Sequence, residues 1–554
     1  MTGAHARQKQ QVGFWRIWLP CFALFGLVMA MWTLASPVAS AADEPTTIVR
    51  AAAAVRGQLV GSQVGPNVAE STVRTQVVVP ATFRLLNNCY SFHPTESAAC
   101  VAERPVPSSR TLGPITTLVG RYPPLYYLIV GLPSYLPGGS SAILFMRMAG
   151  VVVNAALLAI AVAAIRRWAG SRVLLVGFAF AVSPMVLYYS AVINPSGLEL
   201  CSAVCLWVTA TIWAVDYPEH APRGLLWTVT VSAATLIQAR PASPVWPVLI
   251  AVALAPLVWK RRSWRQPSAT LKAIRHRPEL WPMLLILGAS WAFAAAWLVV
   301  VHSFRMVGGN FPPPGTPERQ LIKESIEYMP TYLQQAVGVL GWLDTYLPPA
   351  LIYFWYVAVL ALLGAGLIFS NLRGRAVLLI VMILCFAIPV GGTVADVHSH
   401  GFTSQGRYFL PLFVGMPIVA AALLGKAHRE RHFHLPQAIG TSLIQLSLGA
   451  VGAAQMVAFG TALRRYLVGV DGPILPTVHF KGEWHPPLPG VWLDILALIG
   501  SALLYWFIGR PFAREDRSFP PPFDTEPRPK LSAVFESSDS RAPVAEATGD
   551  GPTS

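Results

Sequence analysis

The chain has 554 residues, of which 54% are hydrophobic and only 12% are charged, and its formal net charge is +15. A soluble domain needs more charge to cover its surface, so this composition excludes an ordinary soluble protein. Continuous apolar runs alternate with short clusters of Arg, Lys, Pro and Gly, which predicts membrane-spanning helices and excludes a transmembrane barrel. The basic residues gather at the ends of these runs, where they fit lipid-facing anchors better than a nucleic-acid surface.

Twelve apolar runs predict an all-α polytopic membrane protein with about twelve spanning helices. The runs cover residues 17–35, 143–165, 173–191, 198–215, 225–239, 243–259, 281–301, 347–369, 376–394, 409–424, 438–463 and 491–508. By the positive-inside rule the basic short links face the cytoplasm, with Arg464-Arg465 as the exception. Both chain ends then lie on the cytoplasmic side of the cell membrane.

The first run is followed by Val38-Ala39-Ser40-Ala41, which resembles a signal-peptidase site. Its 19 apolar residues are long for a signal peptide, so we expect a retained anchor. Cleavage would not change the sidedness of the spans that follow.

Two long outer loops and a tail complete the expected organisation. Residues 37–141 form a large first loop between spans 1 and 2, and residues 302–346 form the second. Within the first, residues 124–136 are apolar and aromatic, which favours a short interfacial or re-entrant helix. Residues 1–510 thus form one transmembrane domain, and residues 511–554, rich in Pro, Ser and acids, a disordered cytoplasmic tail.

The six cysteines fall into two groups. Cys89 and Cys100 lie in the polar first loop, where an outer location predicts a disulfide between them. The other four lie in apolar runs and are expected to be buried thiols: Cys21, Cys201, Cys205 and Cys385.

An acidic pair, Asp43-Glu44, follows the first span by a few residues. Carboxylates held at the outer membrane surface can act as a base, bind a metal or orient a sugar hydroxyl. The alternative is that acids after a helix exit are simply solvated.

An acidic pair before a large outer loop resembles the GT-C class of membrane glycosyltransferases. The segment Arg121-Tyr-Pro-Pro-Leu-Tyr-Tyr127 resembles the His-Pro-Pro-Leu-Tyr-Tyr element of that class, with Tyr122 in place of the His. Four motifs in order also resemble an uncharacterised family of bacterial, largely actinobacterial, multi-pass membrane proteins grouped with GT-C enzymes. They are Asp43-Glu-Pro45, Asn194-Pro-Ser-Gly-Leu-Glu199, Gly341-Trp-Leu-Asp-Thr345 and Gln405-Gly-Arg-Tyr-Phe-Leu-Pro411.

The resemblance implies a GT-C-like fold and transfer of a sugar from a polyprenyl-phosphate carrier outside the membrane, in the assembly of a cell-envelope glycan or glycolipid. Asp43 would be the base that deprotonates the acceptor hydroxyl. Glu44 would support it or help to hold a divalent cation such as Mg or Mn. GT-C enzymes differ in metal use, so the cofactor stays open.

Further candidates follow from the chemistry of a departing lipid phosphate, which needs positive charge near the outer leaflet. Arg407 is the first choice, followed by Arg240 and Arg121; a snorkelling anchor is the alternative for each. Tyr126 of the aromatic element is a further candidate for substrate binding.

Three acidic positions have structural alternatives. Glu199 lies just inside the fourth span, where an acid has either a function or a structural partner. Asp344 lies at the entry to the eighth span, where it has either a binding role or an N-cap role. Asp396, with His398 and His400, could ligate a metal, although such loop residues are usually only solvated.

The sequence leaves three functions open. The first is a lipid-linked-sugar glycosyltransferase, and the second is a lipid or glycan transporter or flippase. A transporter should carry polar residues near the middle of several spans, and few occur here. The third is a non-catalytic scaffold for envelope assembly, in which no single outer acid or Arg matters.

Overall fold

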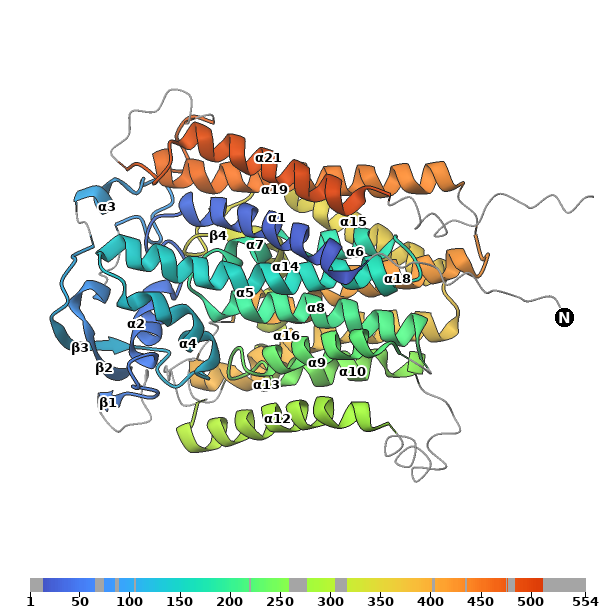
Figure 1. Ribbon diagram of the computed structural model, residues 1–554, viewed down its shortest axis with the longest axis horizontal. Coiled ribbons are helices and arrows are strands. Elements are labelled where there is room, and N and C mark those ends of the chain that lie inside the picture. Colours follow the sequence, from blue (N-terminus) through green and yellow to red (C-terminus); the bar gives the residue numbers. More distant parts are fainter. Residues whose placement is uncertain are drawn as a thin grey trace, which may run out of the picture.

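A computed structural model describes residues 13–64, 74–84, 89–103, 106–218, 221–258, 277–303, 316–400, 404–433, 436–474, 476 and 484–511. Long helices run side by side in one bundle, and a small sheet with several short helices gathers at one end of it (Figure 1). We call that end the loop end.

Within these described residues, nine helices are long and apolar enough to cross a membrane. They are α1 (Phe14–Leu34), α5 (Gly139–Trp168), α8 (Pro195–Asp216), α12 (Trp281–Val301), α15 (Pro349–Phe369), α16 (Leu372–His400), α17 (Gly406–Phe413) continued by α18 (Gly415–Arg429), α19 (Gln437–Val468) and α21 (Gly490–Gly509). A polytopic membrane protein, predicted from the apolar runs, is confirmed.

Three predicted spans take a different form. Residues 173–191 divide into α6 (Leu174–Ala181) and α7 (Pro184–Ser190), because a proline lacks the N–H that would continue the first helix. The fifth and sixth runs form α9 (Arg223–Ile237) and α10 (Val245–Val258), which have 15 and 14 residues and are shorter than an upright span. The count of about twelve spans therefore stays a prediction.

The predicted first loop folds into small elements, which corrects the all-α expectation. They are α2 (Glu44–Ala54), β1 (Ser62–Val64), β2 (Arg74–Pro80), η1 (Ala81–Phe83), α3 (Ala99–Glu103), β3 (Leu112–Thr117), α4 (Leu125–Gly131) and η2 (Leu132–Tyr135). The strands form an antiparallel sheet in the order β1-β2-β3. In β2, Val77 and Val79 are buried while Val78 is exposed, the two-residue alternation of a strand with one covered face. The three consecutive valines show no apolar–polar alternation in the sequence, so the strand could not be recognised from that period.

The helix expected over residues 124–136 is present as α4 and η2, although its place at a membrane interface stays a prediction. The second predicted loop contains α13 (Glu318–Glu327), α14 (Met329–Gly338), β4 (Val339–Leu340) and β5 (Thr345–Tyr346), after η3 (Pro278–Leu280) and α12.

The predicted link 396–408 begins as helix, since α16 continues to His400. The side chains of Asp396, His398 and His400 lie outside the described residues, as does the predicted tail beyond residue 511.

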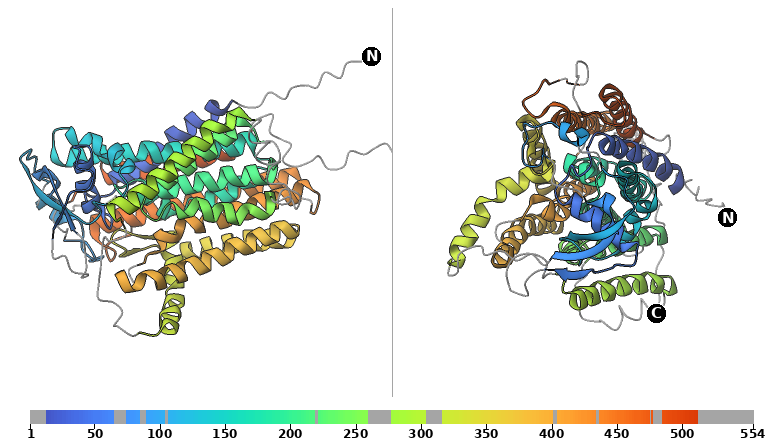
Figure 2. Two further views of the ribbon diagram at one scale, coloured as in Figure 1. Left: turned by 90° about the horizontal axis from the view of Figure 1, so that it is seen from below. Right: turned by 90° about the vertical axis from the view of Figure 1, so that its left-hand side faces the viewer.

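The bundle is closed by contacts far apart in the sequence. Arg166 of α5 donates to the carbonyls of Ile508 and Arg510, so it serves the open C-terminal end of α21 as well as any lipid anchoring. In contrast, α12 lies at the periphery, where little of its length is buried (Figure 2). Among the spanning helices, α8 and the α17–α18 span are the most deeply buried, followed by α5.

Candidate functional site

The Asp43-Glu44 segment sits in a loop that several buried contacts hold in place. Arg147 of α5 binds the Glu44 carboxylate with two hydrogen bonds of 2.8 and 2.7 Å, and both side chains are buried. The same guanidinium donates to the carbonyls of Thr33, Ser36 and Pro37. A guanidinium has five N–H donors, so the Arg147 side chain can bind the Glu44 carboxylate and several backbone carbonyls at the same time. Glu44 is thus part of the framework that shapes the loop.

The Asn194 motif clamps the loop from the other side. The Ile193 N–H donates to Glu44 at 3.0 Å, and the Asn194 side-chain amide donates to the Ala42 carbonyl at 3.1 Å. Asn194 also caps α8 by accepting from the Ser196 N–H at 2.9 Å. Asn194 therefore caps the start of α8, and together with Ile193 it holds the backbone next to Asp43 in place.

Asp43 differs sharply from its neighbour. Its side chain is 46% exposed, and it forms an ion pair with Arg407, whose side chain is only 1% exposed. The Asp43 backbone has a positive φ of 68°, a conformation that costs a non-glycine residue free energy. The loop thus holds one carboxylate at the surface, in an unfavourable backbone conformation, against a buried cation.

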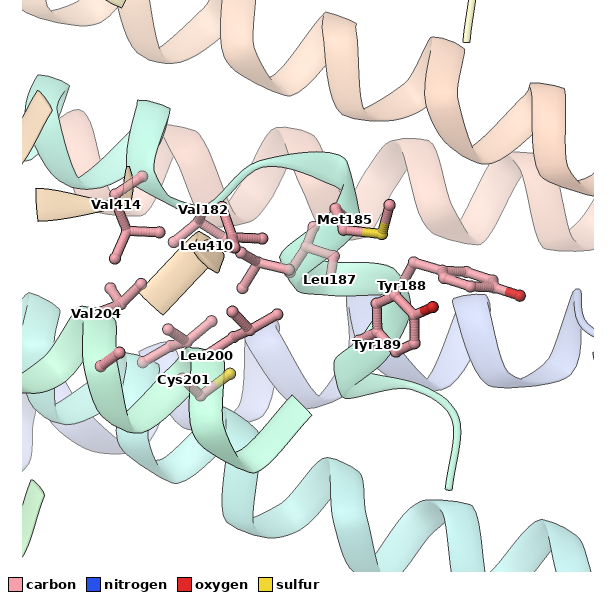
Figure 3. Close-up of a cluster of buried hydrophobic side chains, with 14 of the residues drawn as sticks. Val182, Met185, Leu187, Tyr188, Tyr189, Leu200, Cys201, Val204, Leu410 and Val414 are labelled. Atoms are coloured by element: carbon pink, nitrogen blue, oxygen red, sulfur yellow. The ribbon is translucent and has the colours of Figure 1, made fainter. Parts of the chain in front are cut away.

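Arg407 is held by aromatic residues. It lies in the first turn of α17, donates to the Tyr189 hydroxyl at 2.5 Å and to the Tyr408 hydroxyl at 3.3 Å, and lies over both rings. Figure 3 shows Tyr189 beside Tyr188 on α7, at the end of an apolar cluster that includes Leu200 and Leu410. The cluster anchors the tyrosines, and Tyr189 in turn fixes the direction of the guanidinium.

A second ion pair adjoins the first through the Tyr408 ring. Arg240 donates to Glu199 at 3.1 Å and lies over that ring at 4.5 Å from its centroid. Glu199 also accepts from Ser243 at 2.6 Å and from the Trp246 indole at 2.8 Å. Glu199 therefore has three hydrogen-bond partners, and its Arg lies next to Arg407.

The aromatic segment 121–127 contacts the second ion pair, because Tyr122 lies next to Arg240. Burial raises the pKa of the Tyr122 hydroxyl, and the adjacent Arg240 opposes that shift. Arg50 of α2 holds the segment by donating to the Tyr122 carbonyl at 3.2 Å and packing over the Tyr127 ring. Burial of this cation lowers the pKa of Arg50 to about 10.

Three predicted site residues do not contact the Arg407 ion pair in the interactions described here. Arg121 donates to Gln63 of β1 at 3.0 Å, whereas Tyr126 is buried in α4 next to Glu44 and the backbone of Asn194. Asp344 accepts from Arg465 at 3.2 Å and from the Thr345 hydroxyl at 2.9 Å. It does not cap α15, which begins at Pro349 with Pro348 as its N-cap. Their predicted binding roles stay predictions.

Three residues of this network were missed from the sequence. Arg147 gave a usable signal, since it is a charge inside the apolar stretch that became α5, and such charges have a partner or a role. Tyr408 directly follows Arg407 and could have been grouped with it. Tyr189 gave none, because a tyrosine in an apolar run is typical of an ordinary core.

The two acids do not fit a shared metal site. Both Glu44 oxygens accept from Arg147, while Asp43 faces Arg407, so the carboxylates serve different cations. In the described part of the chain, no group of three or more His, Cys, Asp or Glu side chains is placed to hold a metal ion.

An apolar groove lies near the network. It has a volume of about 350 Å³ and runs between α6, α14, α15, α16 and α17. Its lining includes Phe180, Trp355, Cys385, Leu410 and Phe413. Leu410 follows Arg407 by one helical turn, so α17 connects the groove to the ion pair.

The cysteines match expectation. Cys89 and Cys100 form a disulfide, with Cα atoms 6.3 Å apart. The other four, Cys21, Cys201, Cys205 and Cys385, are buried and free.

The comparison with protein families agrees with the membrane architecture. A model of a family described as a predicted membrane protein, DUF2142, matches residues 25–416, well over half of the chain. The chain therefore belongs to the DUF2142 family of predicted membrane proteins. No curated protein matches the chain significantly.

Proposed function

We propose that this DUF2142 protein is a polyprenyl-phosphate-sugar-dependent glycosyltransferase whose loop end faces the outside of the cytoplasmic membrane. It would build a cell-envelope glycan or glycolipid, with membrane lipid as its surroundings. The observation that carries this proposal is the half-exposed Asp43 paired with the buried Arg407, one turn from an apolar groove.

Asp43 is the proposed base. The acceptor hydroxyl gives its proton to the Asp43 carboxylate as its oxygen forms a bond to the anomeric carbon of the donor. The bond from that carbon to the phosphate oxygen breaks, and polyprenyl phosphate leaves with the electron pair. The exposure of Asp43 makes its carboxylate accessible to an acceptor, whereas Glu44 is enclosed.

Arg407 and Arg240 are the proposed binding groups for the phosphate. In the network the two cations are balanced by Asp43 and Glu199, so charge is neutral before substrate binds. When Asp43 accepts a proton it loses its charge, and its attraction for Arg407 falls. The released guanidinium charge then faces the leaving phosphate, which gains negative charge in the same step.

The groove supports a donor with a hydrocarbon tail. Its lining is almost wholly apolar, and burying such a tail stabilises binding by about 25 cal/mol per Å² of apolar surface. A soluble nucleotide sugar would not use this surface.

Two residues act as positioning groups in this proposal. Glu199 holds Arg240 through its bond of 3.1 Å, and Glu44 holds the loop through Arg147. The poor fit of Asp43 and Glu44 to a shared cation supports a mechanism in which this pair holds no metal.

The proposal is tested with the full chain in lipid nanodiscs. Short-chain polyprenyl-phosphate glucose, mannose, galactose and arabinose are offered with a matching alkyl glycoside acceptor, and free polyprenyl phosphate is measured by mass spectrometry. We expect release with at least one donor. Asp43→Asn should lower its rate by about 100-fold or more, since a carboxylate base contributes roughly 10²–10⁴-fold.

Glu327→Gln is the matched control, because Glu327 is a surface acid of α13 with 62% exposure. It should leave the rate unchanged. Full activity of Asp43→Asn would remove Asp43 from the mechanism. Movement of a labelled lipid across the bilayer without any covalent product would favour a flippase instead.

A further inference from the structure

We propose that Phe92 and Trp342 form an aromatic platform that binds the ring of a sugar beside Asp43. This inference rests on the proposed function, since the ring would belong to the acceptor. The two rings meet edge to face, with centroids 5.3 Å apart, and Phe92 is 67% exposed.

Phe92 is held in a conformation that needs an explanation. It has a positive φ of 63°, which is unusual for a bulky side chain and costs free energy. Its loop is closed by the disulfide between Cys89 and Cys100, and Arg465 of α19 donates to the backbone carbonyls of Tyr90 and His93 on either side. The disulfide and the Arg465 hydrogen bonds therefore hold the Phe92 side chain in an exposed position.

Trp342 is fixed in its own way. Its indole N–H donates to the Ala39 carbonyl at 3.1 Å, and its backbone N–H donates to Asp344 at 3.3 Å. Asp344 is anchored by Arg465, so one arginine supports both halves of the platform. The indole is thus oriented before any ligand arrives, which lowers the entropic cost of binding.

The platform is joined to the proposed catalytic loop. The Ala42 N–H, directly before Asp43, donates to the Gly341 carbonyl, directly before Trp342, at 3.3 Å. Of six non-glycine residues with positive φ in the described part of the chain, four belong to these connected segments. They are Ala39, Asp43, Phe92 and Leu343. Backbone strain that gathers in this manner is typical of functional sites.

The chemistry favours a sugar over lipid. An aromatic face packs against the C–H face of a pyranose, while nearby polar groups accept or donate to its hydroxyls. The neighbours of Phe92 along the loop, His93, Thr95 and Glu96, are polar and exposed. A residue anchored among acyl chains would be surrounded by apolar side chains instead.

The test is saturation-transfer NMR on the full chain in nanodiscs. The probes are the methyl glycosides of glucose, mannose, galactose and N-acetylglucosamine. We expect transfer from the protein to the ring protons of at least one glycoside. Phe92→Leu should weaken that binding by about two- to tenfold, the value of an aromatic contact, while Phe92→Trp should retain it.

Leucine is the matched control because it keeps the apolar character that a membrane anchor needs but lacks an aromatic face. Equal binding by the wild type and Phe92→Leu would overturn the platform, as would the absence of transfer to all four glycosides. Glu327→Gln, which changes a surface acid of α13, should bind the glycosides like the wild type. If the wild type binds glycosides but releases no polyprenyl phosphate, the proposed reaction fails while the platform stands.

Discussion

Two carboxylates one residue apart, Glu44 and Asp43, meet two different arginines. Glu44 and Arg147 are both buried, and the arginine also donates to carbonyls at the end of α1 and in the loop before α2. Asp43 is half exposed, and its arginine is buried among tyrosines. The first pair shapes the loop, and the second has one open side where a substrate can compete.

The comparison shows that two acids adjacent in the sequence can have different roles. A ligand cannot reach an ion pair in which both side chains are buried. Where one side chain is exposed, a ligand can reach the pair and replace that side chain as the partner of the buried charge. The framework pair also explains how the strained backbone of Asp43 persists, because its surroundings determine it from several directions.

The largest effect on stability should follow Glu44→Gln. It leaves the Arg147 charge buried and poorly paired, which costs about 3–5 kcal/mol. We expect a markedly lower midpoint of heat-induced change in tryptophan fluorescence for protein in detergent. The double variant with Arg147→Met should recover part of this loss, because it removes the uncompensated charge. A wild-type midpoint in Glu44→Gln would show that this pair is not the framework.

An intermediate effect is expected for Glu199→Gln. The amide keeps acceptor capacity for Ser243 and Trp246 but loses its charge toward Arg240, which is slightly exposed to solvent. We expect a cost of about 2–3 kcal/mol. Ser243→Ala is the matched control, with a loss of about 1 kcal/mol for one hydrogen bond. If Glu199→Gln and Ser243→Ala unfold at the same temperature, loss of the Glu199 charge costs no more stability than loss of the Ser243 hydrogen bond, and the ion pair with Arg240 does not stabilise the fold.

The smallest stability effect should come from Asp43→Asn. Its carboxylate is half exposed, so water can replace part of its ion pair even though the Arg407 cation is buried, and we expect a cost of about 1–2 kcal/mol. The same thermal assay should give a midpoint below that of the wild type but above that of Glu199→Gln, even though transfer is expected to be lost. A fall as large as that of Glu44→Gln would remove the distinction between the two acids.

Several features of the site were predictable because they lie in local patterns. Asp43, Glu199, Arg240 and Arg407 are charges at the ends of apolar runs, where a charge needs a partner or a role. The pairing of Cys89 with Cys100 followed from their polar loop. The sheet of the first loop was missed, because its strands are short and β2, with three consecutive valines, shows no apolar–polar alternation in the sequence.

By itself the sequence determined the membrane class of the protein, most of its helices and the short list of polar residues with chemical potential. Hydropathy and charge are local properties of the sequence, and each spanning helix must be apolar and internally hydrogen-bonded by itself because it lies in lipid. Only the tertiary structure decided which carboxylate meets which arginine. That choice depends on packing between segments more than 100 residues apart, such as Glu44 with Arg147 and Asp43 with Arg407. No local pattern encodes which side of a buried pair is left open.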